Sequence, residues 1–289
     1  MRHILFKIGP FEIAGYGTMI ALGFILALIM GEKRAKKKEM RDDLIFGLAF
    51  TCIIFGILGA KLMHYITDLK YYLEDPSRFL NIGSGFVVYG GIILGVLAGY
   101  IYCRHYKLNF PEYFDLVMPS VALAQAFGRI GCFLAGCCYG KETDSAIGVV
   151  FKDSPFAPNG VKLIPSQLIS SLLLFILVFI LVRYADKTWR RPFKVAGLYM
   201  ILYSIGRFFI EFLRGDEERG NVGFLSTSQF ISIFILIGGI VLFNLHSMMS
   251  RKKYSPYGEK EDVVEEREVS SEKTMEESTV EEVVEEITE

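Results

Sequence analysis

Repeated apolar runs constrain the fold of this chain more than any other feature of its sequence. An α-helix needs about 20 mainly apolar residues to cross the roughly 30 Å hydrocarbon layer of a bilayer. The chain is 52% hydrophobic, and its apolar residues gather in runs close to that length. The runs are residues 13–30, 44–66, 86–103, 114–134, 166–183, 195–213 and 228–249. We therefore predict an all-α, polytopic membrane protein with about seven transmembrane helices.

The distribution of lysine and arginine between the runs predicts how the chain crosses the membrane. Basic residues concentrate after the first, third, fifth and seventh runs, whereas the intervening connections are mixed or acidic. Cytoplasmic loops carry the excess of Lys and Arg, so this alternation predicts an outside N-terminus and a cytoplasmic C-terminus. No cleavable signal peptide is apparent, because residues 1–10 lack an apolar core.

The composition changes after the last apolar run. We assign residues 1–250 to one transmembrane domain and residues 251–289 to an acidic cytoplasmic tail. The tail ends in EKEDVVEEREVSSEKTMEESTVEEVVEEITE, where valine is almost the only apolar residue. Such a segment cannot bury enough apolar surface to fold alone, so we predict that it is disordered. A docking role for the tail is the alternative.

A small set of polar side chains falls within the apolar runs. A charged group at the centre of a membrane helix costs about 2.5–3.5 kcal/mol on insertion scales, so each one is a candidate functional residue. The set comprises Lys61, His64, Gln125, Arg129, Gln167, Arg207, Glu211 and Gln229, with Arg214 at a boundary. Tyr203, Arg207 and Glu211 are spaced four residues apart, which places them on one face of a helix.

Arg129 and Arg207 are expected at similar depths in the outer half of the membrane. The planar guanidinium group binds phosphate through two parallel hydrogen bonds and keeps its charge when dehydrated. Two arginines therefore predict a phosphate ligand, and in a bilayer the obvious phosphate belongs to a lipid head group. The alternative is an intrahelical ion pair between Arg207 and Glu211, which neutralises itself but leaves Arg129 unexplained.

The segment GRIGCFLAGCCYG, residues 128–140, is rich in glycine, as is the start of the third run. Glycine lets the backbone approach a ligand closely, and non-helical backbone at membrane depth must line a cavity or be buried in protein. The alternative is close helix packing through small residues. Both readings stay open for Gly90 and Gly91, and the cavity is favoured for Gly131 and Gly136.

Three of the five cysteines, Cys132, Cys137 and Cys138, lie in the same segment. They can be small buried apolar groups, a redox centre at the outer face, where disulfides persist, or metal ligands. The C-x4-C-C spacing without a nearby histidine is a weak zinc pattern, so we expect no metal. Cys52 and Cys103 lie in other runs and are expected to be structural.

The motifs resemble, in order, those of the bacterial prolipoprotein diacylglyceryl transferases. GRIGCFLAGCCYG is similar to the family's signature segment, which is close to GRIGNFxNxExxG, and LYSIGRFFIEFLRGD is similar to its sixth-span motif. The other matching segments are IAGYGTMIALGF, SGFVVYGG, IPSQL and FLSTSQFIS. The resemblance covers about residues 10–250.

The resemblance implies a specific reaction in the bacterial cytoplasmic membrane. The family transfers the diacylglyceryl group of phosphatidylglycerol to the thiol of a lipobox cysteine in a prolipoprotein, forming a thioether and releasing glycerol phosphate. Catalytic roles are implied for Arg129, Arg207, Glu211 and Tyr89. The implied substrate-binding residues are Tyr16, Gly90, Gly91, Arg129, Gly140, Gln167, Tyr203 and Arg207. The expected partners are phosphatidylglycerol, the prolipoprotein signal peptide and the bilayer. We expect a monomer, with no cofactor and no nucleic acid.

Several polar positions of the family pattern are changed in this chain. Tyr89 replaces the histidine of HGG, Cys132, Ala135 and Cys137 replace polar signature residues, and Ile164 replaces the histidine of HPSQLYE. The reference pKa of tyrosine is about 10, so Tyr89 is a poor base at neutral pH. Either Glu211 or the leaving phosphate takes the thiol proton, or the acceptor differs. Two further alternatives are a non-catalytic lipid-binding protein and a membrane thiol oxidoreductase that uses Cys132, Cys137 and Cys138.

Overall fold

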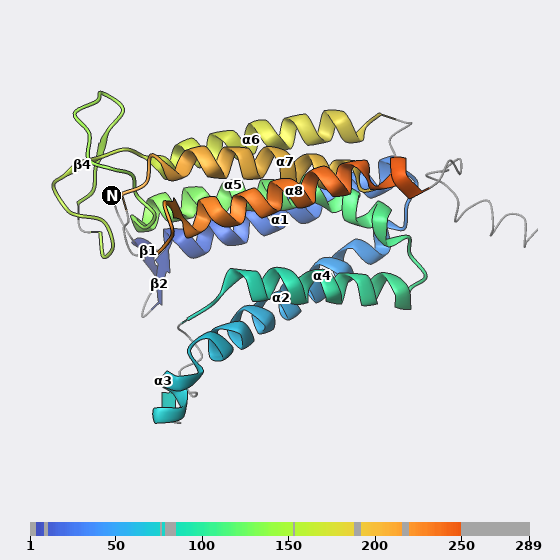
Figure 1. The fold of residues 1–289 in the computed structure, drawn as a ribbon, viewed down its shortest axis with the longest axis horizontal. Helices are drawn as coiled ribbons and strands as arrows, with labels where there is room; N and C mark the ends of the chain where they lie inside the picture. The colour runs from blue at the N-terminus through green and yellow to red at the C-terminus, as the bar shows by residue number, and fades with distance from the viewer. Residues whose placement is uncertain are drawn as a thin grey trace, which may run out of the picture.

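The computed structural model describes residues 4–8, 11–75, 77–78, 85–152, 154–187, 192–215 and 220–249. The acidic tail predicted for residues 251–289 lies outside the described residues. The described chain is mostly helical, as the apolar runs predicted. Figure 1 shows the long helices running side by side, with short strands and loops at one end.

Each predicted run corresponds to one long helix. These are α1 (Gly15–Lys37), α2 (Ile45–Thr67), α4 (Val88–His105), α5 (Phe110–Ala135), α6 (Ser166–Ala185), α7 (Lys194–Glu211) and α8 (Thr227–Met249). The shorter helices are η1 (Asp42–Leu44) and α3 (Leu69–Glu74). The largest difference is at the end of α1, which continues beyond the apolar run through its basic residues.

Three short antiparallel hairpins add strands that the sequence did not predict. β1 (Ile4–Ile8) pairs with β2 (Phe11–Ala14), β3 (Val149–Val150) with β4 (Lys162–Leu163), and β5 (Asn221–Val222) with β6 (Leu225–Ser226). All three lie largely outside the long helices, where hairpin pairing satisfies backbone groups that no helix engages.

Five of the described helices are long and apolar enough to cross a membrane: Gly15–Lys37, Asp42–Thr67, Phe110–Ala135, Ser166–Ala185 and Thr227–Leu245. The other two long helices, α4 and α7, have 18 residues each and carry charged side chains within that length. A helix of this size is about 27 Å long, close to the thickness of the hydrocarbon layer. The count of seven spans and the predicted orientation therefore stay predictions.

α5 is the central helix of the main bundle. It packs against α1, α6 and α7, and α8 packs against α7. The core between α5, α6 and α7 is built from small and branched side chains, including Ala122, Ala126, Leu177, Leu181 and Ala196. Lipid offers no hydrophobic drive between membrane helices, so close van der Waals packing of such side chains holds them together.

α2 and α4 form a separate pair that diverges from the main bundle (Figure 1). Their backbones approach closely at glycines, because a Cβ atom on Gly90 would collide with the carbonyl oxygen of Gly59. A Cβ atom on Gly91 would lie 2.8 Å from the carbonyl oxygen of Gly56. Close helix packing, one of the two readings left open by the sequence, is therefore present at both positions. A substrate-binding role for Gly90 and Gly91 stays a prediction.

Large apolar side chains cover the outside of the helices. Ile25, Phe46, Ile93, Phe179 and Phe234 are each more than half exposed. A soluble monomer rarely presents so extensive an apolar surface to water. These faces instead suit contact with lipid.

One end of the structure gathers the polar motifs. The N-terminal ends of α1, α4, α6 and α8 and the C-terminal ends of α5 and α7 lie there, with the β3–β4 hairpin (Figure 1). Basic residues occupy the last turns of α1, α4 and α6, at the opposite end. The fold therefore brings the motifs of distant segments to one level of the bundle.

Candidate active site

A polar network joins the end of α7 to the start of α8. Arg207 Nη1 lies 2.6 Å from Glu211 Oε2, and the two side chains are only 13% and 9% exposed. Arg207 Nη2 donates a hydrogen bond to Ser228 Oγ at 2.8 Å, and Ser226 Oγ donates one to Glu211 Oε1 at 3.0 Å. The intrahelical ion pair that the sequence left as an alternative is therefore confirmed. It is also anchored to α8, which the helix spacing alone did not indicate.

Two further arginines lie near this network. The charges of Arg129 on α5 and of Arg214, which is buried just beyond α7, both act on Arg207. Within the described part of the chain, Arg129 has neither an ion-pair nor a hydrogen-bond partner, and its side chain is half-buried. Among the described residues, three guanidinium groups thus lie near the carboxylate of Glu211. Guanidinium groups brought together in this way suit an anion such as phosphate.

An aromatic pair fixes the next turn of α7. The rings of Tyr199 and Tyr203 stack with centroids 5.5 Å apart. The Tyr199 hydroxyl donates a hydrogen bond to Gln125 Oε1 at 2.8 Å, which ties α7 to α5. Tyr203 therefore lies one helical turn from Arg207 on the same face, as the spacing predicted.

Sequence reasoning missed the serines of this network. Ser226 and Ser228 belong to FLSTSQFIS, which drew attention only as a matching segment at the start of the last run. Serine close to the first turn of a helix commonly bonds to backbone amides there, and Ser226 Oγ does accept from Gln229 N at 3.2 Å. No pattern within one segment could show that Ser226 and Ser228 also contact α7.

The segment GRIGCFLAGCCYG ends α5 in a tight turn held by α6. Gly136 has a left-handed φ of 78° and Cys138 one of 59°, so the chain turns sharply after the helix. Gln167 Nε2 donates a hydrogen bond to the Cys137 carbonyl at 2.8 Å, and Ser166 Oγ donates one to the Cys138 carbonyl at 2.9 Å. Gln167 is almost completely buried. Its observed contact positions this turn, and its substrate-binding role stays a prediction.

Gly140 lies where this segment meets the end of α7. Its N–H donates to the Ile164 carbonyl at 3.0 Å, and the N–H of Lys141 donates to the Leu213 carbonyl at 2.9 Å. A Cβ atom on Gly140 would lie 2.6 Å from the Ile164 carbonyl oxygen, so a larger residue would push the segments around Gly140 and Ile164 apart. Gly140 thereby holds the loop beside Arg214, with which it forms a β-bridge.

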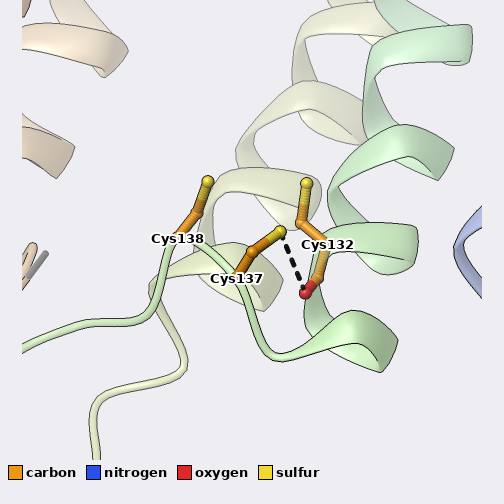
Figure 2. A group of neighbouring side chains, drawn as sticks. All are labelled: Cys132, Cys137 and Cys138. Carbon is orange, nitrogen blue, oxygen red and sulfur yellow. Dashed lines mark hydrogen bonds between the residues drawn. The ribbon is translucent and has the colours of Figure 1, made fainter. Parts of the chain in front are cut away.

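The three cysteines of the segment come together in space. None of the five cysteines forms a disulfide bond, and the Sγ atoms of Cys132, Cys137 and Cys138 lie within 4.8 Å of one another. Figure 2 shows the three side chains close together beside the last turn of α5, where the chain has turned back after the helix. A hydrogen bond with the Cys132 thiol, together with the charge of Arg214, lowers the pKa of Cys138 below the usual value of a thiol. The Cys137 thiol donates to the Cys132 carbonyl at 3.7 Å.

Tyr16 lies beside the same segment. A Cβ atom on Gly131 would be 3.2 Å from the Tyr16 ring and from its carbonyl oxygen, so α1 and α5 pack closely at this level. The Tyr16 hydroxyl is within electrostatic reach of Arg129 and of the three cysteines. The structure thus brings Tyr16 and Arg129 together, as a shared site requires.

Tyr89 comes from the other helix pair. It lies in the first turn of α4, is 44% exposed, and precedes the glycines that pack against α2. α4 packs chiefly against α2, whereas Arg129 and Arg207 belong to the main bundle. A catalytic role for Tyr89 therefore stays a prediction.

A sequence model of a known family, described as prolipoprotein diacylglyceryl transferase, matches residues 3–245. The chain belongs to this family. The phosphatidylglycerol–prolipoprotein diacylglyceryl transferase of Clostridium tetani is 50% identical over 245 residues, which cover 85% of this chain and 98% of that protein. Enzyme 2 of that name from Clostridium perfringens is 49% identical, covering 88% and 98% of the two chains.

More distant relatives show the same coverage. The phosphatidylglycerol–prolipoprotein diacylglyceryl transferase of Clostridioides difficile is 34% identical over 253 residues, 87% of this chain and 97% of that protein. The family match ends at residue 245, before the acidic segment begins. The family match therefore covers the helical part of the chain, which is also the part that carries the matching motifs.

Proposed function

We propose that this protein transfers the diacylglyceryl group of phosphatidylglycerol to the lipobox cysteine of a prolipoprotein. The observation that carries the proposal is the 50% identity to a relative of that name over 98% of its length. The arginines gathered around Arg207 support it independently, because guanidinium groups bind a phosphodiester head group.

The proposed reaction is a displacement at carbon. The acceptor sulfur attacks the diacylglyceryl carbon, a carbon–sulfur bond forms, and the bond from that carbon to a phosphate oxygen breaks. Negative charge develops on the departing glycerol phosphate, and the thiol gives up its proton. Arg129 and Arg207 bind the phosphate and stabilise this charge from positions shielded from water, where electrostatic interactions are stronger than in water.

Glu211 is better suited to positioning than to proton transfer. Its Oε2 is engaged by Arg207 and its Oε1 accepts from Ser226, so both oxygens already have partners. The leaving phosphate therefore receives the thiol proton, which accounts for a site without the family histidine. Tyr203 and Tyr16 flank the two arginines, and Gln167 and Gly140 hold the signature turn next to them.

The proposal includes a membrane topology of seven spans. α4 and α7 are then short spans beside α2 and α8, the N-terminus is outside, and the C-terminus is cytoplasmic. The basic last turns of α1, α4 and α6, which share one end, support this orientation. It puts the arginines in the outer leaflet of the bacterial cytoplasmic membrane, where a monomer admits lipid and signal peptide laterally.

The test is the mass of a reporter prolipoprotein in cells depleted of their own transferase. Wild-type protein is expected to add the diacylglyceryl mass, and Arg129→Ala or Arg207→Ala to lower the rate about 100-fold or more. Arg41→Ala is the matched control, because Arg41 is exposed and pairs with Asp43 outside the long helices. A folded, inserted wild type that adds no mass would overturn the proposal.

The same samples separate the alternatives. Phosphatidylglycerol recovered unchanged with the purified protein, and no product from any thiol acceptor, would indicate a non-catalytic lipid-binding protein. Transfer that persists in Cys132→Ser, Cys137→Ser and Cys138→Ser excludes a thiol oxidoreductase as the main activity, and we expect that persistence.

A further inference from the structure

The transfer reaction leaves the thiol cluster (Cys132, Cys137 and Cys138) without a role. Its three sulfur atoms lie within 4.8 Å of one another, although the residues are spread over the last turn of α5 and the turn that follows it. The left-handed conformations of Gly136 and Cys138 turn the chain back so that the sulfurs share one space (Figure 2). A non-glycine residue with positive φ is uncommon and is often found at functional sites.

The spacing of the sulfurs fits a bound ion. A metal about 2.3 Å from each of three thiolates requires sulfur–sulfur separations of about 3.8–4.0 Å. The three sulfurs reach that arrangement with shifts of about 1 Å or less, given this bond length and the present separations below 4.8 Å. A disulfide needs about 2.05 Å between two sulfurs and would leave the third thiol outside the bond.

The surroundings favour a soft ion. Within the described residues, no imidazole or carboxylate group joins the thiol cluster. Sulfur ligands alone select ions such as Cu(I) and Zn²⁺ over Mg²⁺ or Ca²⁺. The three side chains are partly exposed, so an ion can enter. The buried guanidinium group of Arg214 interacts with Cys138 and offsets the surplus negative charge of three thiolates around one cation.

The turn is also held in place before any ion binds. Gln167 and Ser166 of α6 donate hydrogen bonds to the carbonyl groups of Cys137 and Cys138. Adjacent cysteines fit poorly into a closed tetrahedral site but can supply two corners of a three-coordinate one. We propose that Cys132, Cys137 and Cys138 form a three-thiolate site for a soft, thiophilic metal ion, of which Cu(I) is the best match. The site does not depend on the transfer reaction.

Cadmium titration of the purified full-length protein tests the site. Protein reduced with a phosphine and then desalted is titrated with Cd²⁺, and the thiolate-to-cadmium absorption in the ultraviolet is followed. We expect buffered Cu(I) to release the bound Cd²⁺, and the absorption to saturate at one Cd²⁺ per protein. Cys132→Ser, Cys137→Ser and Cys138→Ser should each lose it. Cys52→Ser is the matched control and should keep it, because Cys52 lies on α2.

Two results would overturn the proposal. One is the absence of a saturating absorption in wild type, or its persistence in folded variants of the thiol cluster. The other is a mass lower by two hydrogens in protein isolated without reductant, restored by the phosphine and lost in the same variants, together with no ion binding after reduction. That second pattern would make the cluster a redox pair. Thermal unfolding of each variant identifies any that fail to fold, and Cys→Ala variants then replace them.

Discussion

Replacing Glu211 with glutamine removes the charge that pairs with Arg207 and will destabilise the folded protein at the end of α7. Glu211 Oε2 lies 2.6 Å from Arg207 Nη1, and both side chains are more than four-fifths buried. Two unit charges about 4 Å apart attract by about 4 kcal/mol at an effective dielectric constant near 20. Glutamine retains an amide oxygen that can accept from Ser226, so that hydrogen bond is kept and does not change the difference. The expected loss of unfolding free energy is therefore about 3–4 kcal/mol, within the range for a buried pair that loses one partner.

A double-mutant cycle measures this interaction directly. Glu211→Gln, Arg207→Met and the double variant are compared with wild type by equilibrium unfolding in mixed detergent micelles containing SDS. We expect the double variant to lose about 3 kcal/mol less than the sum of the single losses, which lies within the known range of coupling energies. Additivity within about 0.5 kcal/mol would refute the reasoning, because it would mean that the two side chains do not interact.

The exposed pair of Arg41 and Asp43 provides the matched control for the cycle. Its Nη2–Oδ2 distance is 3.0 Å, but the side chains are 54% and 61% exposed. Solvent screening limits such pairs to about 0–1 kcal/mol. A coupling energy as large here as at Arg207 would show that burial does not set the strength of the interaction.

Four further substitutions test the packing and the buried polar groups. Gly90→Ala should lower the unfolding free energy by about 1–3 kcal/mol, because its methyl group would meet the backbone of α2. Gly206→Ala, which has open space around it, should be neutral or stabilising by up to about 1 kcal/mol in the same unfolding assay. Gln167→Leu should leave the Cys137 carbonyl unpaired and lower the unfolding free energy by about 1–3 kcal/mol. It should also speed maleimide labelling of the Cys137 thiol, because the turn is held less firmly. Arg34→Met should raise the unfolding free energy by about 1–4 kcal/mol, because the buried guanidinium has no hydrogen-bond partner among the described residues.

Each of these expectations has a clear contrary result. Equal stability of Gly90→Ala and Gly206→Ala would mean that α2 and α4 are not in close backbone contact. Unchanged labelling in Gln167→Leu would mean that α6 does not hold the signature turn. A loss of stability in Arg34→Met would mean that an anion or water satisfies the guanidinium group.

The long helices could be predicted because their signal is local. Length and apolarity identified every long helix, and the four-residue spacing placed Arg207 and Glu211 on one face. The largest error in a predicted boundary is at the end of α1, which continues to Lys37 although the apolar run ends at residue 30. The apolar run ends where the side chains become basic, but the backbone hydrogen bonds of a helix continue regardless of side-chain polarity. Apolarity therefore locates a span better than it locates the end of a helix.

The contacts between segments could not be predicted in the same way. The bond from Ser226 to Glu211 and the bond from Gln167 to the Cys137 carbonyl join residues whose local sequence patterns carry no mutual signal. The clustering of the cysteines depends on a left-handed turn at Gly136 and Cys138. Glycine adopts a positive φ at little cost in free energy, but cysteine has no intrinsic preference for that conformation, so the sequence does not predict it. Local sequence patterns therefore predict the helices, whereas the arrangement of the site depends on contacts between distant segments.

The different restraints on the two arginines fit the proposed reaction. Arg207 is held by Glu211 on its own helix and by Ser228 on the next, so its guanidinium group is already oriented before a ligand arrives. Arg129 has no ion-pair or hydrogen-bond partner among the described residues. A fixed donor reduces the reorganisation needed as charge develops. A free donor can follow the phosphate as the carbon–oxygen bond lengthens. In the proposed reaction, this division of roles assigns the stabilisation of the departing phosphate to the two arginines.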